Sequence, residues 1–217
     1  MDTSSRREDQ QLAARRRREE LLDAANRVVL RDGPEASMNA IAKEAGITKP
    51  ILYRHFGDKG GLYQALAQRH TDALLDTLRA ALDRPGTRRD RVAAGLDAYL
   101  STIEASPQVY RFLMHPSDEP AEGDRSFETS RHAVPMLRRL GEELAHVMAE
   151  RIDLGPGGER TARAWGHGVV GMMYAAGDWW LAEEHCSRAE LVEELTDLLW
   201  GRLTVTPDRR RDRAESA

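Results

Sequence analysis

The chain has 217 residues, enough for one small and one larger hydrophobic core. Its single cysteine, Cys186, excludes an intramolecular disulfide and a cysteine-based zinc site, and no apolar run approaches the ~20 residues that span a bilayer. Residues 1–63 hold 12 basic and 10 acidic side chains (net +2), whereas residues 64–217 hold 20 and 26 (net −6). The single cysteine favours a cytoplasmic protein, and the lack of a long apolar run argues against membrane segments. The charge asymmetry favours an N-terminal part that faces a polyanion.

The N-terminal segment is charged and polar, so residues 1–12 are predicted to be a disordered tail. A helix is expected from about residue 13 to Asp32, with Leu21, Ala25 and Val28 facing inward. Four arginines, Arg15 to Arg18, open this helix. They form either a solvated helix end or an arm that contacts phosphates or the minor groove, and the sequence leaves both alternatives open.

Residues 37–63 read as a helix, a tight turn, a second short helix and the start of a third. Ser37 suits the N-cap of the first helix, and Gly46 supplies the left-handed conformation that ends it. Thr48 is a second N-cap, with Pro50 in the following first turn. The second helix is expected over about 49–56. The side chains predicted to point inward are Ile47, Leu52 and Phe56. Two helices around such a turn form the unit that places its second helix in the DNA major groove.

This stretch resembles the DNA-binding domain of TetR-type (tetracycline-repressor-like) transcriptional regulators. The matching residues are Ile41, Ala42, Ala45, Gly46, Ile47, Thr48, Leu52, Tyr53, Arg54, His55, Phe56, Lys59 and Leu62. The resemblance implies an all-α fold of about nine helices, with a helix-turn-helix DNA-binding head over residues 13–60 and a helical effector-binding and dimerisation body over 61–204. It also implies a homodimer that binds double-stranded DNA at a palindromic operator. The match covers the first third of the chain, and the rest agrees in helical layout only.

The resemblance and the helix pattern together predict a set of DNA-binding residues. They are Ser37, Asn39, Thr48, Lys49, Pro50, Tyr53, His55 and Lys59. Lys59 begins the long helix and is expected to meet a phosphate, aided by the positive helix end. Thr48 and Tyr53 are expected to contact phosphates too, with Ser37 assisting.

Base contacts are expected from Lys49, Pro50 and Asn39, with Pro50 touching a thymine methyl group. Two alternatives accompany this assignment. Tyr53 could pack partly into the core of the head, and Arg54 could be a solvated or internally paired charge.

The body reads as a series of helices separated by breaks rich in proline and glycine. The expected helices cover residues 58–82, 88–105, 107–114, 127–152 (kinked at Pro135), 159–185 and 187–204. Residues 115–125 read as a polar loop and residues 205–217 as a disordered tail. No segment alternates with period two over a useful length, so no sheet is expected.

An apolar stretch over residues 165–181 has two interpretations: a buried core helix, or one wall of an effector cavity. The resemblance favours a cavity, and aromatic and methionine side chains suit an adaptable apolar pocket. The predicted lining is Tyr99, Ile103, Tyr110, Phe112, Leu113, Met136, Leu140, Trp165, Val169, Met172, Met173 and Trp179. No charged residue identifies itself as a polar anchor, so a hydrophobic small-molecule effector, lipid-like or polyketide-like, is expected.

The final helix carries a leucine stripe that needs a partner. The predicted dimer-interface residues are Leu191, Leu195, Leu198 and Leu199. Coverage of the stripe by the body of the same chain is the alternative.

Enzyme signals are absent from the sequence: there is no GxSxG, Walker loop or HExxH. Residues 166–171 match GxGxxG, but no strand precedes them, so close helix packing explains these glycines better than a dinucleotide site. No catalytic residue, metal site or cofactor is predicted. The hypothesis from sequence is a repressor released by its effector. A ligand-insensitive DNA-binding protein, and a small-molecule-binding helical protein that no longer reads DNA, are the alternatives.

Overall fold

The computed structural model describes residues 3–114, 128–151, 154–183 and 185–200. Within these ranges the chain forms nine α-helices, one short 3₁₀ helix and no strand, which confirms the predicted all-α class. The helices are α1 (Thr3–Asp32), η1 (Gly33–Glu35), α2 (Met38–Glu44), α3 (Lys49–Phe56), α4 (Lys59–Leu82), α5 (Arg88–Ala105), α6 (Pro107–Met114), α7 (Glu128–Arg151), α8 (Gly158–Glu183) and α9 (Arg188–Leu199). The predicted loop over 115–125 and the predicted tail over 205–217 lie outside the described residues.

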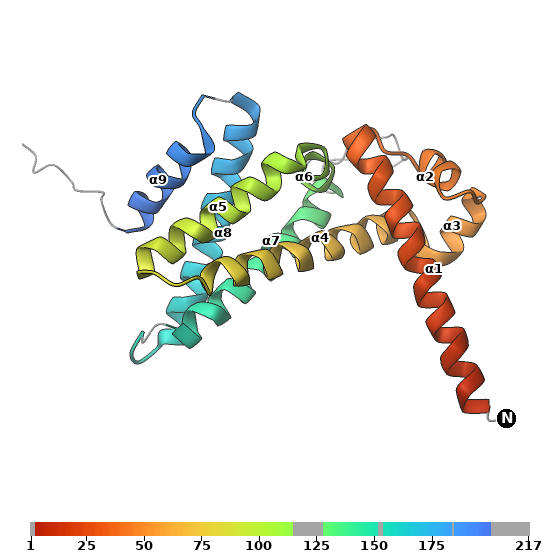
Figure 1. Ribbon diagram of the computed structural model, residues 1–217, viewed down its shortest axis with the longest axis horizontal. Helices are drawn as coiled ribbons and strands as arrows, with labels where there is room; N and C mark the ends of the chain where they lie inside the picture. The colour runs from red at the N-terminus through yellow and green to blue at the C-terminus, as the bar shows by residue number, and fades with distance from the viewer. Residues whose placement is uncertain (1–2, 115–127, 152–153, 184, 201–217) are drawn as a thin grey trace, which may run out of the picture.

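Helix α1 begins much earlier than expected. It starts at Thr3, so the prediction of a disordered tail is wrong for residues 3–12. Residues 6–12 include Arg, Glu, Gln and Leu, which favour helix and need no buried face to form one when the helix continues into a packed segment. The N-terminal part of α1 consequently extends away from the other helices (Figure 1).

The helix-turn-helix unit forms as its sequence predicts. The hydroxyl of Ser37 accepts a hydrogen bond from the backbone N–H of Ala40 at 3.2 Å, and Gly46 has φ of 65°. Thr48 occupies the N-cap position of α3, but its side chain makes no capping hydrogen bond, so the expected hydroxyl cap is absent. Leu52 is fully buried and Phe56 is 8% exposed, which fixes the inner face of α3.

The hydrophobic core of the head extends beyond the predicted boundary at residue 60. It includes Leu62, Tyr63 and Leu66 from α4. It also includes Phe112 and Leu113 from α6. The ring centroids of Tyr63 and Phe112 lie 5.4 Å apart. The hydroxyl of Tyr63 donates to the backbone carbonyl of Leu113. The division at residue 60 stays a prediction, but the packing is continuous across it.

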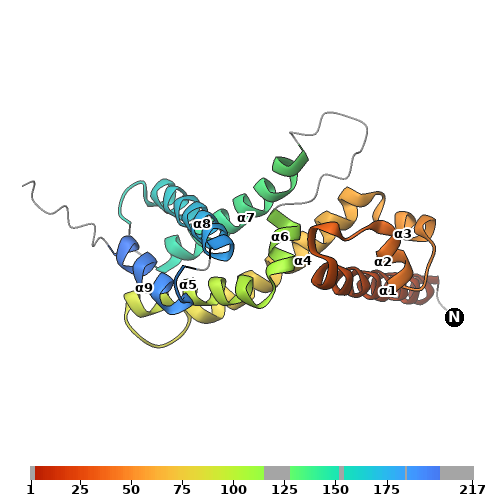
Figure 2. The same cartoon turned by 90° about the horizontal axis from the view of Figure 1, so that it is seen from above.

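The body is built around the far part of α4. Helices α4, α5, α7 and α8 lie side by side, and α9 packs against α5 on the side away from the head (Figures 1 and 2). Glycines bring α7 and α8 close together, because a Cβ atom at Gly166 would lie 2.5 Å from the carbonyl oxygen of Gly141. This confirms close packing as the reason for Gly166, whereas a Cβ atom at Gly168 or Gly171 would meet nothing within 4 Å. None of the helices in the described ranges combines the length and apolar character needed to cross a membrane.

Candidate functional site: a DNA-reading helix and an effector cavity

Helix α3 has one buried face and one face open to solvent. Successive residues turn by about 100° around a helix, so Arg54, midway between buried Leu52 and Phe56, lies on the opposite face. Pro50 is on the same outer side, four residues earlier, and is also exposed. The outer face of α3 is therefore basic and free of other protein among the described residues.

The predicted base-contacting residues all reach the surface. Asn39 on α2, and Lys49 and Pro50 at the start of α3, are exposed. Lys49 also lies close to Tyr53, with its Nζ 5.7 Å from the ring centroid, a cation–π contact that steadies both side chains. All three side chains are therefore accessible at the surface of the head.

The predicted phosphate contacts are less uniform. Thr48 and Lys59 are exposed, and Lys59 is the first residue of α4, whose N-cap Asp58 accepts from the Gly61 N–H at 2.7 Å. Tyr53 is half-buried and packs partly against the head core, so the core-packing alternative holds in part. The hydroxyl of Ser37 caps α2, and the residue is half-buried.

Arg54 is the outward residue that the sequence interpretation set aside. It is exposed and makes no ion pair among the described residues. His55, which the sequence interpretation chose instead, is half-buried on the flank of α3. Counting helical angles from Leu52 and Phe56 would have identified Arg54 from the sequence.

The arginine run of α1 belongs to a helix and not to an extended arm. Arg18 stacks over Phe56 of α3, with its guanidinium carbon 4.9 Å from the ring centroid, and Arg17 pairs with Glu20 at 2.7 Å. Arg15 and Arg16 are exposed. Arg18 thus packs against α3, whereas Arg15 and Arg16 remain as two cations at the surface.

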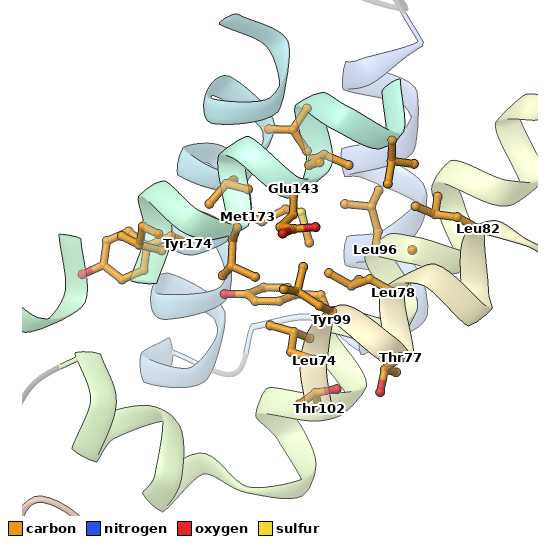
Figure 3. A pocket seen from close by; sticks show the side chains of 18 of the residues that line it. Leu74, Thr77, Leu78, Leu82, Leu96, Tyr99, Thr102, Glu143, Met173 and Tyr174 are labelled. Atoms are coloured by element: carbon orange, nitrogen blue, oxygen red, sulfur yellow. The ribbon is translucent and has the colours of Figure 1, made fainter. Parts of the chain in front are cut away.

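The body encloses a cavity of about 710 Å³, within the roughly 300–1,000 Å³ typical of ligand pockets. Its walls come mainly from α4, α5, α7 and α8, and α6 closes it toward the head. Figure 3 shows Leu78, Leu96 and Tyr99 pointing into this space from α4 and α5, with Met173 facing them from α8. The surface of the cavity is predominantly apolar, as a hydrophobic ligand requires.

Most of the predicted cavity residues lie where the sequence placed them. The predicted residues that line it are Tyr99, Ile103, Tyr110, Leu113, Met136, Leu140, Trp165, Val169 and Met173. Three do not. Phe112 packs into the head core. Met172 packs against the body core, the buried cluster that includes Leu96, Leu100 and Trp180. Trp179 is 43% exposed and donates its Nε1–H to Glu183 at 2.8 Å. One side of α8 faces inward and the other faces solvent, so neighbouring residues in its apolar run have different surroundings.

Hydrogen-bonding tyrosines gather at one place on the cavity wall. The Tyr110 hydroxyl lies 3.5 Å from the carbonyl oxygen of Tyr174 and 3.4 Å from a carboxylate oxygen of Asp178. Burial raises the pKa of Tyr99 and of Tyr110 far above its ordinary value, so both phenols keep their protons. Both are therefore neutral polar groups on the cavity wall, and the hydroxyl proton of Tyr110 is already directed at Tyr174 and Asp178.

Charged residues also line the cavity, contrary to the expectation of no polar anchor. They are Arg79, Arg88, Arg91, Glu143 and Arg151. Arginines are common along this chain, so their number in the sequence carries no signal. Only the folding of α4, α5 and α7 brings these residues to one cavity.

The leucine stripe of α9 is mostly used inside the chain. Leu191 and Leu195 are 5% and 8% exposed and pack in the body core against α5, and Leu199 lines the cavity. Only Leu198 remains open, at 42% exposed. The prediction of a dimer interface is therefore wrong for Leu191 and Leu195, and the alternative, coverage by the body, describes them.

The open apolar surface of the C-terminal part lies on α8 instead. Exposed residues recur there every three or four positions, at Trp165, Gly168, Gly171, Ala175 and Trp179. A Cβ atom at Gly168 or Gly171 would meet nothing within 4 Å. In the described part of the chain, no three His, Cys, Asp or Glu side chains are grouped to hold a metal.

Comparison with known proteins matches both regions. Residues 21–66 match the model for bacterial regulatory proteins of the tetR family, and residues 77–215 match a tetracyclin repressor-like C-terminal domain. An HTH-type regulator of Mycobacterium tuberculosis is 31% identical over 202 residues, which cover 93% of this chain and 83% of the relative. The HTH-type transcriptional activator FasR of Mycolicibacterium smegmatis is 29% identical over 191 residues (87% and 83%). A tetR-family regulator of Streptomyces coelicolor has a similar structure, with a TM-score of 0.60, 25% identity and coverage of 84% of this chain and 78% of that one.

A helix-turn-helix head on a helical body with an apolar cavity defines the class of DNA-binding transcriptional regulators. The chain belongs to the TetR family of these regulators.

Proposed function

We propose that this chain is a homodimeric repressor that reads a palindromic operator through α3 and leaves it when a hydrophobic effector fills the cavity. The observation that carries the proposal is the outer face of α3. Pro50 and Arg54 are exposed there, and Lys49 is exposed at the start of the helix. Leu52 and Phe56 hold the opposite face in the head core. A helix so mounted can enter a major groove without rearranging the fold.

Helix α6 supplies the physical connection between effector and DNA. Val109 and Leu113 belong to the head core and also line the cavity. A ligand that presses on these two side chains acts directly on the packing of the head. Long helix α4 is the second connection, since it begins in the head and ends beside the cavity.

The effector would act by changing the separation of two heads. Bound to one face of DNA, the heads of a dimer sit one helical turn, about 34–36 Å, or a multiple of it apart. An effector that binds better to another separation lowers DNA affinity by its differential affinity for the two arrangements. The cavity favours this ligand-responsive model over the ligand-insensitive alternative.

The dimer is best supported at the open face of α8. Its small residues, Gly168, Gly171 and Ala175, allow two helices to approach closely, and Trp165 and Trp179 add large apolar area at either end. A two-fold partner using the same face would cover all five residues at once.

Activation is the second candidate for the sign of regulation, because FasR, a relative over most of its length, is described as an activator. Deleting the gene separates the two: target expression rises for a repressor and falls for an activator. Retardation of genomic fragments by the purified protein tests the DNA-binding part, and failure to retard any fragment would favour the helical protein that no longer reads DNA.

A further inference from the structure

Four arginines and one carboxylate line the cavity, although its surface is otherwise mainly apolar. Two of the arginines are already neutralised. Arg79 bonds to Glu143 at 2.8 Å and to Asp76 at 3.1 Å. Arg151 bonds to Asp83 at 2.5 Å and to the carbonyl oxygen of Leu82 at 3.1 Å.

The other two, Arg88 and Arg91, form no ion pair with a carboxylate among the described residues, although the charge of Arg91 acts on neighbouring Asp90. Arg91 donates only to the carbonyl oxygen of Gly86, at 2.9 Å. The adjacent Asp90 is engaged in capping α5, where its carboxylate accepts from the backbone N–H of Thr87 at 2.8 Å. Arg89, between them, turns away from the cavity and pairs with Asp197 at 2.6 Å. In the first turn of α5, Arg89 therefore pairs with α9, whereas Arg88 and Arg91 line the cavity without an ion pair.

These two cations occupy one end of the cavity. Residues three apart lie on the same side of a helix, so Arg88 and Arg91 can reach one ligand together. They stand at the α4–α5 connection, which lies at the end of the body away from the head (Figures 1 and 2). The opposite end of the cavity is closed by α6, with Val109 and Leu113. The cavity is therefore polarised, cationic at one end and apolar at the other.

We propose that the effector is an anionic amphiphile, with an apolar chain in the cavity and a carboxylate or phosphate head group bound by Arg88 and Arg91. Guanidinium groups pair with both oxyanions in a fork geometry, and such charge-assisted bonds are stronger than neutral ones. The inference rests on the proposed function, since it names the chemistry of the effector for the same cavity. With the oxyanion of the ligand held at this end of the cavity, the apolar chain of the ligand extends toward α6. Helix α6 also belongs to the core of the DNA-binding head.

The test compares ligands that share one chain and differ in the head group. Palmitic acid, hexadecyl phosphate and uncharged 1-hexadecanol are titrated into the full-length protein, using tryptophan fluorescence because Trp165 and Trp200 line the cavity. The anionic ligands are expected to bind about 10- to 100-fold more tightly than hexadecanol. A stronger response to the phosphate or to the carboxylate identifies which head group the site takes.

The double variant Arg88→Gln/Arg91→Gln should lose this preference while binding hexadecanol as before. Its matched control is Arg84→Gln/Arg160→Gln, which removes two exposed charges that do not line the cavity and should keep the preference. Thermal melting establishes that both variants fold. Equal affinity for hexadecanol, palmitate and hexadecyl phosphate, or an unchanged preference in the first variant, would overturn the anion site while leaving a hydrophobic effector in place. Absence of binding by all three ligands would overturn both the anion site and the proposed hydrophobic effector.

Discussion

The head and the body of this protein encode their functions in different ways. In the head, the DNA-reading surface is made by one contiguous stretch, because α2, the turn and α3 follow each other within residues 38–56. In the body, the cavity is assembled from helices far apart in the sequence, from α4 to α9. A local motif therefore fixes the positions of its own residues, whereas the lining of a cavity depends on which face each helix turns inward.

The two regions nevertheless share packing. The substitutions that test this are those with the largest expected effect on the free energy of unfolding. Leu52 in the head core and Leu100 in the body core are both fully buried. Replacing either with alanine should cost about 2–5 kcal/mol of the free energy of unfolding. Since α6 completes the head core and Met136 packs against both cores, we expect one cooperative unfolding transition that moves to lower temperature in each variant.

Calorimetry of Leu52→Ala and Leu100→Ala measures this directly. Two resolved transitions, one shifted in each variant, would show that head and body unfold independently and would contradict coupling through α6.

The open face of α8 provides the next test, in the body alone. Gly171→Glu puts a charge at a position with free space around it in the single chain, so the fold should be preserved. Across a two-fold interface the two carboxylates would face each other, and dimer affinity should fall by about a hundred-fold or more. Sedimentation measures the change, with Ala80→Glu on the exposed side of α4 as the control. An unchanged dimer would place the interface elsewhere.

The outer face of α3 gives a smaller effect in the head. Arg54→Ala should weaken binding to DNA, and if Arg54 meets a phosphate the slope of log affinity against log salt should flatten by about one unit. His55→Ala should change affinity less, because His55 is half-buried on the flank of the helix. Fluorescence anisotropy with a retarded fragment compares them. A larger loss for His55→Ala than for Arg54→Ala would reverse the assignment.

The smallest effect is the pH dependence of the contact between head and body. His70 of α4 lines the cavity, and its Nε2 lies 2.9 Å from the side-chain oxygen of Asn26 in α1. Burial, with a further contribution from the charge of Arg69, lowers the pKa of His70 below its ordinary value. The unfolded chain then binds the proton more readily, so the contribution to stability is full above about pH 6.5 and is lost as pH falls through the folded-state pKa.

Melting temperatures between about pH 7.5 and 5.5 should therefore fall less in His70→Gln than in the unmodified protein. His146→Gln, at an exposed position on α7, serves as the control and should keep the original slope. Identical slopes for all three proteins would remove His70 from the account.

The sequence predicted the elements of both regions and the inner face of α3, because helix caps, glycine turns and apolar spacing are local signals. Ser37 and Gly46 behave as their types predict. Prediction from the sequence failed where the surroundings of a residue depend on tertiary packing. The stripe of α9 needed a partner, but periodicity could not say that α5 supplies it to Leu191 and Leu195.

The same limit explains the arginines of the cavity. Arg88, Arg89 and Arg91 are adjacent in a basic stretch, and only the packing of α9 against α5 separates the paired one from the other two. The N-terminal part of α1 was missed for another reason. A polar sequence rich in helix formers can be helical without any apolar stripe when it extends a packed helix.

Selection of genomic DNA fragments by the full-length protein tests the central claim most directly. We expect enrichment of a two-fold symmetric sequence whose half-sites lie about one helical turn, 34–36 Å, or a multiple of it apart. This enrichment should be lost when Lys49 and Arg54 are replaced by alanine. Recovery of no common sequence, or of one bound equally well by that double variant, would contradict it.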